Sequence, residues 1–217
     1  MKRLALLCCL LSLFVFAGCT TASHTINGNQ YVSTMNPSAN ITVPDDFTYV
    51  GHFKMQHNGR KGARLVRIVS NYDLFAKSNA DNEIIEYLSI RRSHLPSHWR
   101  WESDIWGDAG KFYKTHTTLA GETYSNCIYP GYMTEAEPLT ELLDKKGLKR
   151  SSDYMINSLG KMYAMGDNLF ITYGRAYTPE ENIQNGKLTE AGRKLVFEVT
   201  SVFKNTITFE EYQEEAS

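Results

Sequence analysis

The sequence predicts an α+β fold: a single domain in which an antiparallel β-sheet built from hairpins is packed with a few helices. Several segments alternate apolar and polar residues with a period of two and are bounded by turn residues, which indicates half-buried strands. Other segments begin and end with the residue types that favour helix termini. The expected strands follow one another directly instead of alternating with helices, and this order is typical of the α+β class.

The first hairpin is expected where the folded region begins. Phe47 to Gln56 places apolar residues such as Tyr49 and Phe53 at alternate positions, which predicts a strand with one buried face. Asn58-Gly59 is typical of a tight turn, and Ala63 to Ser70 supplies the partner strand. The same pattern predicts two further hairpins, Phe112 to Leu119 with Thr123 to Tyr129, and Met162 to Met165 with Leu169 to Tyr173.

The remaining elements are one more strand and the helices. Glu83 to Arg91 fits a helical stripe about as well as a buried strand, and its β-branched and aromatic content favours the strand. Pro138 to Lys146, followed by Gly147, has the proline and glycine positions of a short helix. Thr178 to Glu181 resembles a capping box that opens a brief helix, and Thr189 to Lys204 carries an apolar stripe at helical spacing.

The start of the chain has the pattern of a secretory leader. Lys2 and Arg3 are followed by an unbroken run of apolar and small residues from Leu4 to Ala17. As a helix this run would rise about 21 Å, compared with roughly 30 Å for the hydrocarbon core of a bilayer. A cleaved signal is therefore favoured over a permanent transmembrane helix.

The end of the leader, Phe16-Ala17-Gly18-Cys19, resembles the lipobox of bacterial lipoprotein precursors. Ala17, Gly18 and Cys19 match that pattern, and Phe16 stands where leucine is usual. The resemblance covers the first tenth of the chain, and the length is similar to that of small bacterial lipoproteins of undefined function. It implies cleavage before Cys19 and a diacylglycerol on its thiol that holds the protein on a membrane of the cell envelope. In a cell with two membranes, Thr20 favours the outer one. The alternative is an ordinary cleaved signal peptide.

Beyond the leader, composition divides the chain in two. Residues 19–43 are rich in Thr, Ser, Asn and Gly, which predicts a lipidated cysteine followed by a flexible tether in which His24 is solvated. Residues 44–217 are expected to form the single domain and to end in an acidic tail. The formal net charge of −1 provides no basic face for nucleic acid.

Cysteine and histidine usage gives little support to catalysis. Cys127 is the only cysteine besides those of the leader and lipobox, so no intramolecular disulfide is possible and a buried core thiol is expected. His94 and His98 have the spacing of zinc hydrolases, but Pro96 interrupts the helix that this spacing requires and Glu102 would be a distant third ligand. We therefore expect no metal and no cofactor. An envelope hydrolase would have to use Cys127 as nucleophile, with His116 or His98 as base.

The three tryptophans lie within eight residues and suggest a recognition surface. Trp99, Trp101 and Trp106 alternate with charged residues such as Arg100, and tryptophan and arginine are enriched where proteins bind partners. Such a surface would suit a protein or a glycan of the envelope, although the rings could also cover one end of the sheet. The sequence thus predicts a non-catalytic binding or interaction module. The alternatives are the hydrolase and a structural envelope lipoprotein.

Overall fold

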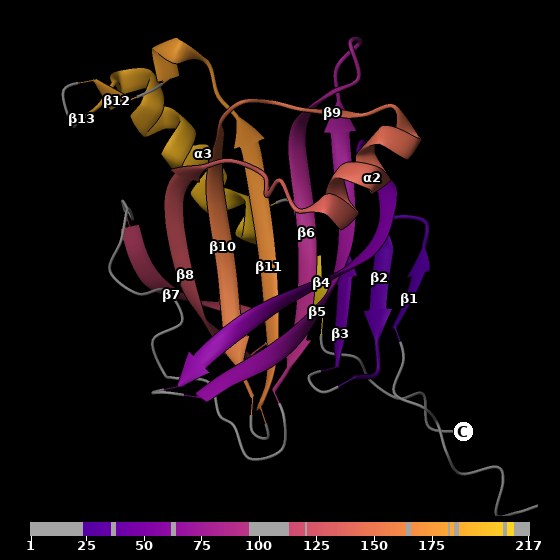
Figure 1. Ribbon diagram of the computed structural model, residues 1–217. Helices are drawn as coiled ribbons and strands as arrows, with labels where there is room; N and C mark the ends of the chain where they lie inside the picture. Colours follow the sequence, from indigo (N-terminus) through magenta and orange to yellow (C-terminus); the bar gives the residue numbers. More distant parts are fainter. Residues whose placement is uncertain are drawn as a thin grey trace, which may run out of the picture.

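The computed structural model describes residues 24–35, 38–61, 64–95, 113–119, 121–163, 166–181, 183–184, 187–205 and 208–210. Over these residues the chain is mainly antiparallel β-sheet with two α-helices, so the predicted sheet with a few helices is confirmed and β-structure dominates (Figure 1). The strands are β1 (His24–Asn27), β2 (Gln30–Ser33), β3 (Ala39–Thr42), β4 (Thr48–Lys61), β5 (Arg64–Ser78), β6 (Glu83–His94), β7 (Tyr113–Leu119), β8 (Glu122–Gly131), β9 (Lys149–Arg150), β10 (Tyr154–Met162), β11 (Asp167–Ala176), β12 (Ile183–Gln184), β13 (Lys187–Leu188) and β14 (Thr208–Glu210). The helices are α2 (Glu137–Lys146), the short 3₁₀ helix η3 (Pro179–Glu181) and α3 (Glu190–Asn205).

The main sheet has the strand order β4-β5-β6-β11-β10-β8-β7, and neighbours along this path are antiparallel. The short strand β9 pairs in parallel with the start of β6. A second sheet has the order β1-β2-β3-β14, and β12 and β13 form a two-stranded ribbon. In Figure 1, β4 and β5 run diagonally across the front of the other strands of the main sheet.

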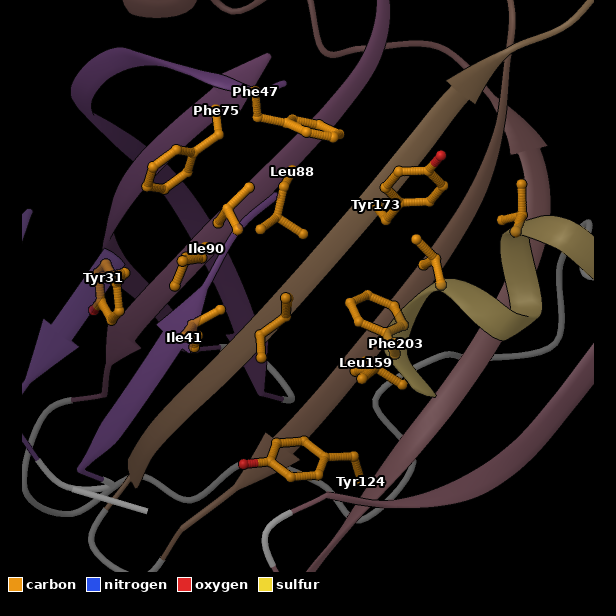
Figure 2. Packing of buried hydrophobic residues seen from close by; sticks show 14 of the residues in the cluster. Tyr31, Ile41, Phe47, Phe75, Leu88, Ile90, Tyr124, Leu159, Tyr173 and Phe203 are labelled. Atoms are coloured by element: carbon orange, nitrogen blue, oxygen red, sulfur yellow. The ribbon is translucent and has the colours of Figure 1, made fainter. Parts of the chain in front are cut away.

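The two faces of the main sheet have separate apolar cores. One face packs against α3 and against the small sheet, with Leu195 and Phe203 of α3 and Ile41 of β3 buried in one cluster (Figure 2). The opposite face packs against α2, through Leu139 and Leu143. We call these the α3 face and the α2 face. Both faces of the sheet are therefore covered in part, which explains why its central strands contain long apolar runs.

The N-terminal segment differs from the expected tether. From His24 onward it forms β1, β2 and β3, and Tyr31 and Ile41 are buried against the α3 face. The tether prediction is therefore wrong for the described residues of this segment, 24–35 and 38–43. The polar composition was misleading because β2 and β3 are short and bury only every second residue, so few apolar residues are enough to attach them.

The pairing of the two strands of the first hairpin is confirmed, but the position of the turn and the face on which some side chains lie differ from the prediction. Asn58 and Gly59 lie within the ladder, and the chain turns between Lys61 and Arg64 instead. A register shift between Tyr49 and Gly51 inserts one extra residue into β4. This bulge reverses the alternation, so that Tyr49 packs in the core of the α3 face whereas Phe53 packs in that of the α2 face.

Most of the other predicted elements are confirmed. β6, the hairpin of β7 and β8, α2 and α3 lie where the sequence placed them, and Gly147 ends α2 in the left-handed conformation with φ 67°. The capping box opens η3, where the Glu181 carboxylate accepts a hydrogen bond from the Thr178 amide at 2.9 Å. The strand preceding β11 was predicted at Met162 to Met165, but among the described residues it is β10, which runs from Tyr154 to Met162.

Candidate functional site

Several residues singled out in the sequence fall outside the described residues. These are Cys19, Trp99, Arg100, Trp101 and Trp106, together with His98 and Glu102. The proposed lipid attachment and the proposed tryptophan surface therefore remain proposals. The site described below is built from other residues.

Cys127 is confirmed as a buried core thiol, with 0% of its surface exposed. It lies on β8, opposite Ser158 of β10 and Lys114 of β7, while His116 lies opposite Ser125, two pairs further along the ladder. A nucleophile has to be reached by its substrate, so a fully buried thiol does not favour the hydrolase.

The α2 face contains a cavity of about 470 Å³. Its walls include Phe53 of β4, Tyr72 of β5 and Tyr129 of β8, and we call it the aromatic cavity. β4 and β8 are separated by four other strands in the sheet order, yet both contribute to this one cavity. The main sheet must therefore curl around the cavity, with α2 contributing Leu139 to its wall.

The aromatic cavity is lined mainly by apolar and aromatic side chains. The Phe53 and Tyr72 rings stack with their centroids 4.8 Å apart, and Tyr132 at the wall is 71% exposed, which places it at the mouth. The polar lining residues include Ser89 and Thr172, which lie opposite one another on β6 and β11. The cavity is thus an apolar space with a few hydroxyl groups.

Burial keeps the tyrosines of this face protonated. It is the largest cause raising the pKa of both Tyr87 and Tyr129 above the ordinary value of 10.0. Tyr154, below the cavity, donates its hydroxyl hydrogen bond to the Ile84 carbonyl at 2.8 Å, and burial raises its pKa to about 12. These phenols therefore act as neutral hydrogen-bonding groups and not as bases near neutral pH.

Arg91 lies beside the aromatic cavity on the same face. It follows Ser89 by two residues on β6 and pairs across the ladders with Tyr72 and Phe170. Its guanidinium carbon lies 3.8 Å from the centroid of the Phe170 ring, and its buried Nε has no hydrogen-bond partner among the described residues. No carboxylate of the described residues lies within ion-pairing distance of this guanidinium.

A second group of chemically capable residues lies on the α3 face. His24 Nε2 is 3.2 Å from Asp73 Oδ2, and His52 Nδ1 is 3.3 Å from Asp73 Oδ1. The ligand atoms of all three side chains lie within 4.8 Å of one another. We call these residues the His–Asp cluster. They come from β1, β4 and β5, so the cluster connects the small sheet to the main one.

The neighbours of the His–Asp cluster hold its carboxylate in place. Asp73 is only 3% exposed, and Oδ1 accepts a hydrogen bond from the Tyr49 hydroxyl at 2.9 Å. The His24 ring stacks on Tyr31, with centroids 5.6 Å apart. A cavity of about 170 Å³ adjoins the cluster and is lined by His24 and Asp73 among others, including Arg92, whose Nε donates to the Tyr31 hydroxyl at 2.7 Å.

Neither site was found from the sequence. The aromatic cavity depends on the curl of the sheet, which brings strands distant in sequence into one wall. The His–Asp cluster joins a residue expected in a tether to two residues of a hairpin, and the bulge in β4 is what places His52 on the same face as Asp73. The only available signal was the presence of His52 in an expected strand, because Asp73 lies beyond the predicted partner strand, Ala63 to Ser70.

Comparison with known proteins finds no matching family model, no matching curated protein and no matching solved structure. Among the helices that the structure describes, none has the length and apolar character needed to cross a membrane. The function is therefore inferred from the geometry of the aromatic cavity and the His–Asp cluster.

Proposed function

We propose that this protein is a lipid-anchored binding module of the cell envelope that holds an acidic amphiphile in the aromatic cavity. The observation that carries the proposal is the cavity itself, apolar in most of its lining and flanked by the unpaired guanidinium of Arg91. An amphiphile here means a fatty acid or a phospholipid, with an apolar chain and a carboxylate or phosphate.

The size and lining of the aromatic cavity support an apolar chain. Its volume of about 470 Å³ lies within the roughly 300 to 1,000 Å³ that is common for small-ligand sites. Aromatic and aliphatic walls gain free energy when they exclude water with an apolar partner, at about 25 cal/mol for each Å² buried. The few hydroxyl groups, such as those of Ser89 and Thr172, can orient the ligand.

The charge beside the cavity supports an acidic end. A guanidinium that is partly removed from water is stabilised by an anion, and Arg91 has no carboxylate partner among the residues described. Its cation–π contact with Phe170 orients the group without neutralising it. A carboxylate or phosphate would supply the missing hydrogen bonds.

The lipobox resemblance supports the location. A diacylglycerol on Cys19 would hold the domain at a membrane, where acidic amphiphiles are concentrated. The Trp99 to Trp106 segment is proposed as an additional surface for a protein or glycan partner, and it is independent of the cavity.

Labelling in intact cells tests the proposal with the full chain. Cells producing it are given a fatty acid that carries a photoreactive group and an alkyne, and irradiated adducts are mapped by mass spectrometry. We expect light-dependent adducts on peptides that contain Tyr72 or Tyr129, and the adduct mass distinguishes a free acid from a phospholipid. Acylation of Cys19 by the probe needs no light, which separates it from these adducts.

Cavity-filling variants provide the control. Ser89→Phe places a ring inside the cavity and should remove most of the labelling, whereas Ser89→Ala should retain it. Because Ser89→Phe could disturb folding, Tyr132→Asp at the exposed mouth gives a second route to the same loss. The proposal is wrong if the light-dependent adducts lie instead around Phe197, an exposed residue of α3, or are unchanged in both blocking variants.

A further inference from the structure

We infer that His24, His52 and Asp73 bind one divalent transition-metal ion of the Zn²⁺ class. The two imidazoles and the carboxylate come from three different strands, and their ligand atoms lie within 4.8 Å of one another. This site is distinct from the aromatic cavity, because it lies on the opposite face of the main sheet.

The spacing of the ligand atoms fits such an ion. Zn²⁺ binds imidazole nitrogen and carboxylate oxygen at about 2.0 to 2.2 Å, which places neighbouring ligands of a tetrahedral site roughly 3.3 Å apart. The two nitrogen-to-oxygen distances in the cluster are 3.2 and 3.3 Å. The first distance ends on Oδ2 of Asp73 and the second on Oδ1, so each imidazole faces one oxygen of the same carboxylate.

The charge balance of the cluster also favours a cation. Asp73 is buried, and no lysine or arginine of the described residues lies within ion-pairing distance of it. A buried carboxylate requires positive compensation. The two imidazole rings lie 5.4 Å apart, close enough for each to offer a ring nitrogen to one ion beside the carboxylate. One divalent ion compensates the carboxylate and leaves both rings neutral.

The surroundings match those of an open metal site. The Tyr49 hydroxyl is bound to Oδ1 of Asp73 and fixes the carboxylate, as outer-shell partners of metal ligands commonly do. The adjoining cavity of about 170 Å³ has room for several water molecules beside His24 and Asp73. Three protein ligands with solvent in the remaining position form the usual arrangement of an accessible zinc site.

The test uses the full-length chain in detergent, purified through a tag that contains no histidine and then treated with a chelator. Co²⁺ is added first, because its visible absorption distinguishes four or five ligands from the six waters of the free ion. We expect one Co²⁺ per chain with the intense bands of low coordination, and Zn²⁺ should displace it. Affinity for Zn²⁺ is then measured by competition with a coloured chelator.

Two ligand variants and two matched controls decide the outcome. His52→Ala, at a partly exposed position, and Asp73→Asn should each weaken Zn²⁺ binding by at least about tenfold. Loss of an outer-shell partner alone commonly lowers metal affinity by about 10- to 100-fold, and loss of a direct ligand should cost no less. His57→Ala on the same strand should bind as the wild type does. His94→Ala should do so too, since His94 and Asp167 form an isolated pair at 2.6 Å. Circular dichroism checks that each variant folds. A six-coordinate Co²⁺ spectrum, or equal affinity in His52→Ala and His57→Ala, would overturn the inference.

Discussion

Arg91 combines a charge with a buried hydrogen-bond donor that has no partner in the described structure. Such a group costs free energy unless something satisfies it, and in this protein the neighbouring groups are the aromatic ring of Phe170 and the aromatic cavity. The charge also acts on a neighbouring side chain. Burial is the largest cause that lowers the pKa of His57, and the charge of Arg91 is the second.

The role of Arg91 can be separated from that of the apolar walls by changing only its charge. We expect Arg91→Met to reduce light-dependent labelling by a photoreactive fatty acid but to leave labelling by the matching fatty alcohol unchanged, because the alcohol carries no anion. The ratio of the two adducts, measured in the same cells, checks this. An equal fall with both probes would assign Arg91 to the packing of the cavity and not to recognition of the acidic end.

The pairing of β6 with β11 depends on a glycine that makes room for a ring. Gly174 lies opposite Tyr87, and a Cβ added at Gly174 would lie 2.1 Å from Tyr87 Cε1. A real Cβ cannot approach an atom so closely, so the ring and the strand that carries it would have to move. Tyr87 also forms part of the wall of the aromatic cavity, which connects this packing to the proposed ligand site.

A double-mutant cycle tests that packing. Gly174→Ala should destabilise the fold by about 1 to 3 kcal/mol, the usual cost of overpacking a core. In the Tyr87→Ala background the same change should cost much less, since the clashing ring is absent. Urea unfolding of the four proteins gives the free energies of unfolding. Equal costs of Gly174→Ala in both backgrounds would show that the ring is not the obstacle.

At the scale of the elements, patterns that repeat over many residues predicted most of the structure. Most of the long strands and both α-helices were found, since their apolar residues recur with the period of the element, whereas β10 was missed. A single inserted residue in β4 was not predictable in this way, and it moved Tyr49 and Phe53 to opposite faces. The position of His52 beside Asp73 follows from that bulge, and so the His–Asp cluster could not be predicted from the alternating pattern.

At the scale of the whole molecule, buried tyrosines are distributed over both faces of the main sheet. Tyr31 lies on the α3 face and Tyr87 on the α2 face, and burial is the largest cause that raises the pKa of each. The arrangement of both sites could not be foreseen because it depends on which distant strands become neighbours. A curled sheet and a small second sheet were not encoded in any local pattern.

These raised pKa values predict sensitivity to alkali. The folded state holds the phenols protonated above the unfolded value of 10.0, with the pKa of Tyr154 at about 12, so their contribution to stability is complete below pH 10 and is lost as the pH rises toward 12. We expect tyrosinate absorption from the buried residues to appear together with loss of the far-ultraviolet circular dichroism. Full ionisation of the tyrosines near pH 10 in a protein that keeps its circular dichroism would contradict this.

The early start of β1 would limit how far the domain could move from a membrane if Cys19 carries the proposed lipid. The expected tether would have allowed the folded part to drift, but the chain is already paired into a sheet at His24. With a lipid on Cys19, as proposed, only five backbone steps separate the acylated residue from that strand, and fully stretched they reach about 18 Å. Such a short linker would keep the domain next to one leaflet of the membrane. The protein would then exchange its ligand with the lipids of that leaflet and would not carry the ligand to a distant layer of the envelope.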